Sequence, residues 1–465
     1  MNSYQHIDQF AFTASSIASL CQATCIRSTS SLIVDVQIDS RLCSSGSLFF
    51  ALKGEHTDGF TYIKAVSEKG AAAVVVPSEH AQDAMHLCDC AILVSDDVLA
   101  SLHALSRSYL SLFPQLTTVG ITGSCGKSTT KEAIACIAEQ LGLTAKTPGN
   151  LNSEYGLPLS TFSLEKQSRY GIFEMGIDHV GEMDRMVSIL KPTLGLLTNI
   201  GISHLEKLGS QEIIAQEKAK IFHPDLEAGF VSRSCKHLPR IEKQASRTLY
   251  RYDADAVQAV DMGLEGWLVT YGGETFQIRA VGKHLLEDVV GAITVGAYLG
   301  ASPREIARSL EGFTPMPGRS SVHRSDITII DDSYNASLDS TRSIISYVSN
   351  LRWGGEKKVV LGPMKELGTQ SQAAHRAVAN LLARSTFARA YLFGSEMEEA
   401  ASQLWRLGYA DKVLFTENFE ELEHSVEKQS NRGDLFLLKA SRSVGMERMI
   451  PSLTEYAARR PLRYA

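Results

Sequence analysis

The stretch from Thr117 to Lys131 constrains the fold of this chain more than any other. It reads Thr-Thr-Val-Gly-Ile-Thr-Gly-Ser-Cys-Gly-Lys-Ser-Thr-Thr-Lys, so a β-rich run enters a glycine turn and a helical segment then continues to about Leu141. Glycines allow backbone N–H groups to approach a phosphate, and the N-terminus of a helix adds a positive dipole. The pattern predicts a phosphate-binding loop between a strand and a helix. The alternative is an ordinary structural turn.

Two side chains of this loop point to nucleotide chemistry. Lys127 would reach the β- and γ-phosphates, and the hydroxyl of Ser128 would bind Mg²⁺. The loop is shorter than usual, because Ile121 stands five residues before Gly126, where a glycine is the common residue. We expect an ATP-using enzyme whose nucleotide-binding residues include Gly123, Ser124, Cys125, Gly126, Lys127, Ser128 and Thr129.

Length and composition narrow the class of protein. A chain of 465 residues is long enough for three domains. Its 44% hydrophobic and 21% charged residues are typical of a soluble globular protein, and a net charge of −6 argues against nucleic acid as a partner. No apolar run reaches the length of a membrane span, and Met1 to Gln5 lack the features of a signal peptide. We expect a cytoplasmic protein, a monomer without membrane insertion, whose eight cysteines are reduced.

The chain divides by pattern into three regions, which we expect to be α/β domains of residues 1–112, 113–318 and 319–465. The first has short strand-like runs, then a helix over 95–112 and a linker at Phe113-Pro114. The second begins with the phosphate loop, and its apolar strands end in polar residues, as buried parallel strands do. A passage over 247–280 is more polar and is predicted to be antiparallel. The strands expected in these two regions are 48–52, 72–76, 91–94, 170–174 and 193–199.

The third region is the most regular. Its strands alternate with helical segments, and such a succession of βα units predicts a Rossmann-like, doubly wound parallel sheet. Because no Gly-x-Gly-x-x-Gly follows its first strand, this character does not imply NAD. Residues 315–319, Pro-Met-Pro-Gly-Arg, form a second predicted linker. The strands expected here are 327–330, 358–361, 390–393, 412–415 and 435–438.

Three polar residues stand at or just beyond strand ends of the second region. Glu174 and Asn199 close two strands, and His204 follows five residues later. In a doubly wound sheet all three would converge on the crevice that holds the phosphate loop, where a carboxylate is a suitable Mg²⁺ ligand. Glu174 as a helix cap and His204 as a loop histidine are the structural alternatives. Lys218 and Lys220 lie on a predicted helix, and composition alone places both at the solvated surface.

At this point the residues resemble those of the Mur ligase family, the ATP-dependent amide-forming enzymes of peptidoglycan synthesis. Thr-Gly-Ser-Cys-Gly-Lys-Ser-Thr-Thr-Lys is similar to the family's shortened phosphate loop. The resemblance extends over nearly the whole chain and is carried further by residues 39–41, 46–54, 147–158, 331–336 and 438–443.

The resemblance implies a reaction and a division of labour. It implies that D-alanyl-D-alanine is joined to UDP-N-acetylmuramoyl-tripeptide through an acyl phosphate, with ATP consumed. The N-terminal domain would hold the UDP-sugar end, the central domain would bind ATP, and the C-terminal domain would close over the site. The substrate-binding residues that it implies are Asp39, Ser40, Arg41, Lys53, Asn150, Asn152, Ser441 and Arg442.

The resemblance also implies a role for Lys218, and a second metal ion, that the residue types alone do not indicate. Lys218 falls at the position that the family carbamylates with CO₂, which would turn an ammonium into an anion able to support a second Mg²⁺. Lys127, Glu174, His204 and Lys218 would then carry catalysis, with Ser128, Glu174, His204 and Lys218 as metal ligands. Further ATP contacts would come from His284, Arg319, Asp332 and Asn335.

The chain departs from the family pattern at three places. Where the family often has Gly-x-His-Asn-x-x-Asn, Leu285 and Asp288 replace the two asparagines. Pro363 stands where an aspartate is usual, and Ser337-Leu338 stands where Asn-Pro is expected. Other readings are a third-residue-adding ligase, a folylpolyglutamate synthase and a P-loop NTPase switch. The first would be expected to carry an Asp-Asn-Pro-Arg-like motif, and a uridine-nucleotide domain argues against the second.

Overall fold

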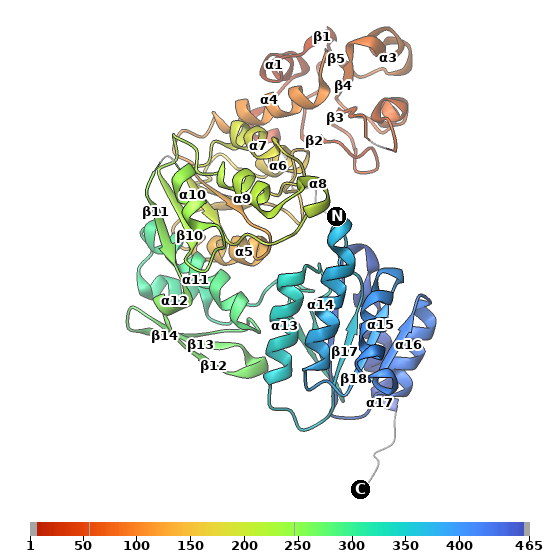
Figure 1. Cartoon of the computed structure of the whole chain (residues 1–465). Coiled ribbons are helices and arrows are strands. Elements are labelled where there is room, and N and C mark those ends of the chain that lie inside the picture. The colour runs from red at the N-terminus through yellow and green to blue at the C-terminus, as the bar shows by residue number, and fades with distance from the viewer. Residues whose placement is uncertain (1–6, 55, 246, 460–465) are drawn as a thin grey trace.

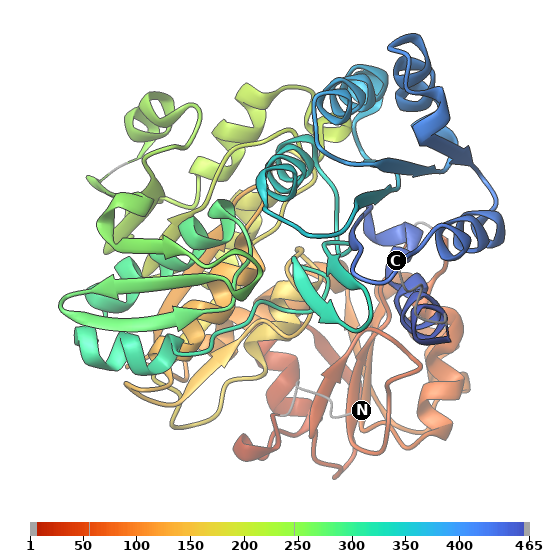
Figure 2. The same cartoon turned by 90° about the horizontal axis from the view of Figure 1, so that it is seen from below.

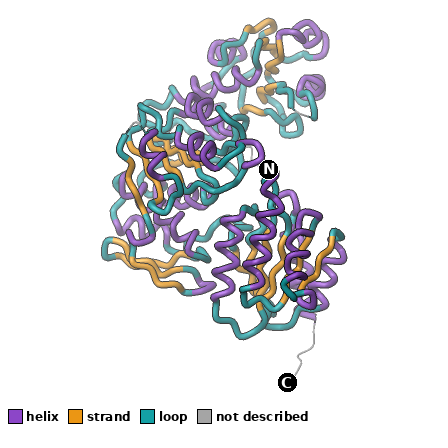
Figure 3. The backbone as a smooth tube through the Cα atoms, in the orientation of Figure 1, coloured by secondary structure: helices purple, strands orange, loops and turns teal. Residues whose placement is uncertain are grey.

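The computed structural model describes residues 7–54, 56–245 and 247–459, and its sheets follow the three sequence regions in order. Met1 to Gln5, whose sequence lacks signal-peptide features, lie outside the described residues. Figure 1 shows three lobes that succeed one another along the chain, from the red and orange N-terminal lobe to the blue C-terminal one. In each lobe strands form an inner sheet with helices around it (Figure 3). The expected three-part α/β architecture is confirmed, and no helix of the described residues is long and apolar enough to span a membrane.

The N-terminal sheet has five strands in the order β1-β5-β4-β3-β2. Its strands are parallel except for β1, which pairs antiparallel with β5 at the edge. The helix predicted over 95–112 is shorter in the structure than expected. It ends at Leu110, and Leu112 is exposed. The strands are β1 (Thr24–Arg27), β2 (Asp35–Gln37), β3 (Ser47–Phe50), β4 (Ala73–Pro77) and β5 (Ala91–Ser95), and the helices are α1 (Ala14–Leu20), α2 (Ile63–Glu68), α3 (Ala81–Leu87) and α4 (Val98–Leu110).

The central sheet has six parallel strands in the order β11-β10-β9-β6-β8-β7. Its phosphate-loop strand β6 is central, and Val119 and Ile121 on that strand are fully buried. The strands are β6 (Thr117–Thr122), β7 (Thr144–Lys146), β8 (Tyr170–Glu174), β9 (Leu194–Leu197), β10 (Ala228–Ser232) and β11 (Leu249–Tyr252). The helices are α5 (Lys127–Ala138), α6 (Gly156–Thr161), α7 (Glu182–Leu190), α8 (Leu205–Leu208), α9 (Gln211–Ala219), α10 (Leu238–Gln244), α11 (Lys283–Tyr298) and α12 (Pro303–Leu310).

The passage over 247–280 is only partly antiparallel. Its first strand, β11, pairs parallel with β10 and completes the central sheet, so the prediction is wrong there. A separate antiparallel sheet follows, with β13 between β12 and β14. It forms the green ribbon at the edge of the molecule in Figure 2. These strands are β12 (Gln258–Asp261), β13 (Trp267–Tyr271) and β14 (Glu274–Ile278).

The C-terminal sheet has six strands in the order β15-β16-β20-β17-β18-β19. All neighbours are parallel except β15, an edge strand that sequence reasoning missed. The strands are β15 (Ser321–Arg324), β16 (Thr328–Asp331), β17 (Lys357–Leu361), β18 (Arg389–Phe393), β19 (Val413–Thr416) and β20 (Leu435–Lys439). The helices are α13 (Leu338–Asn350), α14 (Ser371–Ala383), α15 (Glu398–Arg406), α16 (Phe419–Lys428) and α17 (Met449–Arg459).

The N-terminal and central parts share one hydrophobic core. Tyr109 of α4 is fully buried, and its ring centroid lies 5.3 Å from that of Phe162. Its hydroxyl donates a hydrogen bond of 2.8 Å to the carbonyl oxygen of Leu164. Because apolar residues of both parts belong to the same buried cluster, α4 fixes the N-terminal sheet against the central one.

Candidate active site

The phosphate loop lies at the carboxyl end of β6, where the sequence predicts it. Gly126 has φ +86°, a left-handed conformation that favours glycine, and no described side chain caps the helix α5 that follows. The first N–H groups of α5 can therefore face an anion. Nζ of Lys127 donates to the carbonyl oxygen of Gly123 at 2.7 Å. Burial lowers the pKa of Lys127, and the charge of Glu174 opposes that shift.

Residues that follow β9 hold this loop in place. The side-chain amide of Asn199 accepts from the N–H of Cys125 at 3.0 Å and donates to the carbonyl oxygen of Cys125 at 3.1 Å. Thr198 donates to the same carbonyl oxygen at 2.5 Å. A side chain at Gly123 is excluded, since its Cβ would lie 1.9 Å from Oγ1 of Thr198. Asn199 therefore reaches the predicted crevice but acts there as a support for the loop.

A cavity of about 540 Å³ opens beside the loop and brings together side chains of the central and C-terminal parts. The predicted residues that line it are Ser124, Cys125, Gly126, Lys127, Ser128, Thr129, Asn150, Asn152, Glu174, His204, His284, Arg319, Asp332 and Asn335. A single cavity with both phosphate-binding and domain-bridging groups can hold a nucleotide next to a second substrate.

Glu174, at the end of β8, has the features of a metal ligand. Its Oε2 accepts a hydrogen bond of 3.1 Å from Nδ2 of Asn152. Its Oε1 is buried and has no hydrogen-bond partner among the described residues, and Nζ of Lys131 lies 3.7 Å away, beyond hydrogen-bond distance. A buried carboxylate oxygen of this kind is costly unless a cation or a donor meets it. Glu174 and Ser128 both line the cavity, and their oxygen atoms are of the type that Mg²⁺ prefers.

Sequence reasoning missed Lys131, which lies behind Glu174. Its side chain is buried, with Nζ 3.7 Å from Oε1 of Glu174 and 2.8 Å from Oε1 of Glu132. Nζ also donates to the carbonyl oxygen of Thr147 at 2.8 Å. The spacing of four residues from Lys127, which places both lysines on one face of α5, is the signal that could have found it.

Lys218 is buried in α9, which contradicts the surface position that composition gave it. Only 1% of the residue is exposed, and its side chain makes no hydrogen bond or ion pair with any residue that the structure describes. Burial, and then the charge of Lys127, holds the pKa of Lys218 well below its ordinary value. Lys220, in contrast, keeps a partly exposed side chain that pairs with Asp184 and Glu217, each at 2.6 Å. The surface prediction therefore fails for Lys218 but fits Lys220.

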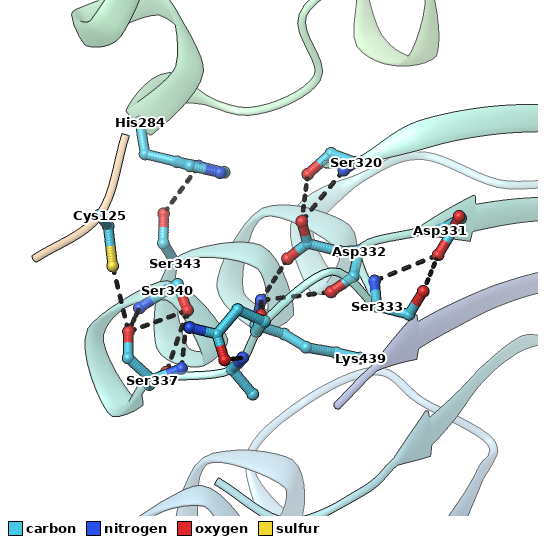
Figure 4. Close-up of polar contacts among 12 residues, drawn as sticks. Cys125, His284, Ser320, Asp331, Asp332, Ser333, Ser337, Ser340, Ser343 and Lys439 are labelled. Carbon is cyan, nitrogen blue, oxygen red and sulfur yellow. Dashed lines mark hydrogen bonds and ion pairs between the residues drawn. The ribbon is translucent and has the colours of Figure 1, made fainter. Parts of the chain in front are cut away.

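The C-terminal part supplies a buried ion pair at the cavity. Nζ of Lys439 lies 2.5 Å from Oδ2 of Asp332 and donates to the carbonyl oxygen of Asn335 at 3.0 Å. The other carboxylate oxygen of Asp332 accepts from the N–H of Ser320 at 3.0 Å. Figure 4 shows Lys439 reaching this group of residues from β20. Lys439 was not predicted; it holds two of the predicted ATP-contacting residues in place.

Two contacts in Figure 4 join the central and C-terminal parts. Sγ of Cys125 lies 3.2 Å from the hydroxyl oxygen of Ser337, and Nδ1 of His284 lies 3.1 Å from that of Ser343. Burial lowers the pKa of His284 to about 4, so its imidazole is neutral at pH 7. The described structure therefore has the C-terminal part docked against the phosphate loop.

Asp288, one of the departures from the family pattern, lies directly against the phosphate loop. It is 6% exposed, and a Cβ on Gly126 would come within 2.1 Å of its Oδ1. Burial raises the pKa of Asp288 to about 8, while Arg319 and Lys127 oppose the shift. The protonated form thus prevails at pH 7, which avoids an anion where phosphates are expected to bind.

A second cavity of about 660 Å³ lies on the N-terminal part. It is lined by the predicted residues Asp39, Ser40, Arg41 and Lys53, and the guanidinium of Arg41 pairs with Asp39 at 2.6 Å. Tyr155, which sequence reasoning did not single out, lines both this cavity and the first one. A long substrate could therefore place one end in each cavity, with its middle next to Tyr155.

Four predicted residues line neither cavity: Gly123, Lys218, Ser441 and Arg442. Ser441 supports the β17 loop, because its hydroxyl accepts from the N–H of Lys365 at 3.0 Å. Arg442 pairs with Glu447 at 2.6 Å, and its guanidinium lies 5.7 Å from the ring centroid of Tyr334, a cavity residue. Arg442 therefore does not line the cavity itself but lies next to Tyr334, which does.

Family models match this chain in three segments. Residues 33–105 match the Mur ligase family catalytic domain, residues 121–296 the Mur ligase middle domain, and residues 318–442 the Mur ligase glutamate ligase domain. The UDP-N-acetylmuramoyl-tripeptide–D-alanyl-D-alanine ligase of Treponema pallidum is 34% identical to this chain, over 90% of this chain and 93% of the relative.

Solved structures agree with this similarity. The crystal structure of MurF from Acinetobacter baumannii has a TM-score of 0.84 at 25% identity, covering 96% of this chain and 99% of that one. The MurF ligase of Thermotoga maritima in complex with ADP has a TM-score of 0.77 at 26% identity, covering 92% of this chain and 98% of that one.

Proposed function

This chain belongs to the Mur ligase family, and we propose that it joins D-alanyl-D-alanine to UDP-N-acetylmuramoyl-tripeptide in an ATP-dependent reaction. The products are UDP-N-acetylmuramoyl-pentapeptide, ADP and phosphate, which places the enzyme in peptidoglycan precursor synthesis. The relative's function favours this reading over a third-residue-adding ligase, a folylpolyglutamate synthase or an NTPase switch. The observation that carries it is the match to a D-alanyl-D-alanine ligase over 90% of this chain and 93% of that relative, in a chain whose two cavities share Tyr155 as a lining residue.

The phosphates of ATP bind at the N-terminus of α5. Uncapped N–H groups, the ammonium of Lys127 and the guanidinium of Arg319 converge there from two parts of the chain. Several anions meet at this place during the reaction, so fixed cations lower the barrier. Asp332 and Asn335, held by Lys439, complete the nucleotide side of the cavity.

Ser128 and Glu174 are the residues that would hold Mg²⁺, which neutralises phosphate charge when bound. A second ion would be held near His204 and Lys218. The buried amine of Lys218 is shifted toward its neutral form, and a neutral amine is the form that attacks CO₂ to give a carbamate. The resulting anion would balance the charge of Lys127, which lowers the pKa of Lys218, an effect that Cys125 and Glu182 oppose.

The chemistry starts from a carboxylate, which an amine cannot attack directly. The terminal carboxylate oxygen of the tripeptide attacks the γ-phosphorus of ATP, the bond to the bridging oxygen breaks, and ADP leaves. The amine of D-alanyl-D-alanine then attacks the acyl-phosphate carbonyl, and phosphate leaves from the tetrahedral intermediate. No covalent enzyme nucleophile is needed. Docking of the C-terminal part, through Arg319 and Ser337, encloses the acyl phosphate and keeps water away from it.

The UDP end of the substrate occupies the cavity at Asp39, Ser40, Arg41 and Lys53, and its peptide extends past Tyr155 to Asn150 and Asn152. This arrangement assigns uridine-nucleotide binding, ATP binding and closure to residues 1–112, 113–318 and 319–465. Those boundaries remain our proposal.

The test measures ADP release with each substrate alone and with both together. We expect ADP release to require UDP-N-acetylmuramoyl-tripeptide and D-alanyl-D-alanine together, with formation of the pentapeptide product seen by mass spectrometry. Hydrolysis of ATP that is indifferent to both substrates would show the ligase proposal to be wrong. A panel that varies the third residue of the tripeptide would then define specificity at that position.

A further inference from the structure

His204 and Glu366 form a contact between the central and C-terminal parts. Nδ1 of His204 lies 2.6 Å from Oε2 of Glu366. The backbone adds to the contact, because the N–H of Glu206 donates to the carbonyl oxygen of Glu366 at 3.2 Å. A Cβ on Gly368 would meet Cβ of Glu206 at 3.2 Å, so the two loops lie in close contact.

Both loops adopt an uncommon backbone conformation where they meet. His204 has φ +59° and Glu366 has φ +63°, the left-handed region that non-glycine residues rarely adopt. Such conformations cost free energy and persist where the surroundings impose them, often at functional sites. As both residues of this contact have them, the geometry of the contact is set by the two loops.

The two edges of the His204 ring have different environments. Nδ1 is buried and makes no hydrogen bond of normal geometry with a described residue. The polar atom that lies against it is Oε2 of Glu366. The side chain is nevertheless 29% exposed and lines the main cavity. Because Nδ1 is covered, the exposed edge is the one that includes Nε2. A carboxylate against one ring nitrogen fixes the tautomer and leaves the other nitrogen free to bind a metal.

We infer that Glu366 is a positioning residue that orients His204 for the metal, so that the metal site of the central part is completed by docking of the C-terminal part. The inference rests on the metal-ligand role proposed for His204. A pair this exposed adds little to the free energy of unfolding, so its main effect is on the orientation of the His204 ring. Metal binding and docking then favour each other, since coupling between two equilibria is reciprocal.

The test measures binding of Mn²⁺ in the presence of ADP by electron paramagnetic resonance, which needs no turnover. Loss of an outer-shell carboxylate weakens metal binding by about 10- to 100-fold, and we expect this for Glu366→Ala. Glu366→Gln, which retains an oxygen acceptor, should lose less. Glu206→Gln is the matched control, because Glu206 is an exposed carboxylate in the same pair of loops, and it should bind Mn²⁺ like the unmodified protein.

A double variant separates the two proposals. If Glu366 acts through His204, the variant with both His204→Ala and Glu366→Ala binds Mn²⁺ as weakly as His204→Ala alone. Additive losses, or an unchanged affinity in Glu366→Ala, would overturn the positioning role. If His204→Ala itself leaves Mn²⁺ affinity unchanged, the metal-ligand role of His204 fails and the inference fails with it. Should Glu366→Ala not fold, Glu366→Gln and Glu366→Asp decide by the same measurement.

Discussion

Arg319 and Ser128 are 191 residues apart in sequence, and Nη2 of Arg319 donates a hydrogen bond of 2.7 Å to the hydroxyl oxygen of Ser128. The guanidinium also stacks on Tyr334, with its carbon 4.2 Å from the ring centroid. One planar cation therefore contacts both the phosphate loop and an aromatic side chain of the C-terminal part. A lysine has neither the fork nor the flat face for this arrangement.

Replacing Arg319 should reduce use of ATP. A hydrogen bond to a charged group contributes more binding free energy than a neutral one. Arg319→Ala should therefore lower kcat/KM for ATP about 10- to 100-fold. Arg319→Lys should restore little of it. Steady-state ADP release measures this, with Arg376→Ala as the control, because Arg376 is half exposed and pairs only with Glu399 among the described residues. Equal activity of Arg319→Lys and the unmodified enzyme would contradict the role.

Asp288 should make nucleotide affinity depend on pH. Burial raises its pKa to about 8, so the group is neutral below that pH and an anion above it. An anion beside Gly126 repels the phosphates, and affinity for ADP should fall as pH rises above 8, by up to about tenfold per pH unit. Calorimetric titrations at pH 6.5, 7.5 and 9 check this. Asp288→Asn should remove the dependence, and an equal fall in that variant would assign it to another group.

Lys218 should be essential for ligation. Lys218→Ala removes the amine that would carry the carbamate, and we expect activity to fall about 100-fold or more, with partial rescue by added short carboxylates. A carbonyl signal from ¹³C-labelled bicarbonate, present in the enzyme and absent from Lys218→Ala, would identify the carbamate. Lys220→Ala is the control, since Lys220 is partly exposed and paired. Near-normal activity of Lys218→Ala would refute the assignment.

Cys125 should be protected from alkylation by ATP. Its Sγ lies in the phosphate loop, 3.2 Å from the hydroxyl oxygen of Ser337, so an adduct would occupy the nucleotide site and separate two docked parts. We expect iodoacetamide to inactivate the enzyme more slowly when ATP is present. Cys125→Ala should remain active and resist the reagent. Labelling of Cys125 at the same rate with and without ATP would count against this prediction.

Strand positions could be predicted from sequence because they depend on local apolar runs. The strand expected over 170–174 coincides with β8, and its terminal Glu174 lies in the cavity as expected for the carboxyl end of a parallel strand. The edge strand β15 was missed because its residues are partly exposed or exposed and form no apolar run. Pairing of β11 with the central sheet depends on strand neighbours, which a polar sequence does not reveal.

Fewer residues of the candidate site could be predicted from the local sequence. The burial of Lys218 comes from the packing of α9, and no residue type next to it distinguishes it from Lys220. Only resemblance to a family singled it out. Lys439 and Glu366 act on Asp332 and His204 from distant positions in the chain, so their roles depend on how the C-terminal part docks. Motifs with a fixed local geometry, such as the phosphate loop, can be read without that knowledge.

Tyr155 should contribute to recognition of the whole sugar–peptide substrate but not of its nucleotide end. It lines both cavities and is 40% exposed, whereas Tyr62 lines only the N-terminal one. Removing the ring in Tyr155→Ala should raise KM for UDP-N-acetylmuramoyl-tripeptide about tenfold while binding of UDP alone is unchanged. Tyr62→Ala should weaken both, and Tyr155→Phe should behave like the unmodified enzyme if the ring makes the contact. Steady-state kinetics and UDP titrations measure the two quantities, and an equal loss of UDP binding in Tyr155→Ala would place Tyr155 in the nucleotide pocket instead of between the two cavities.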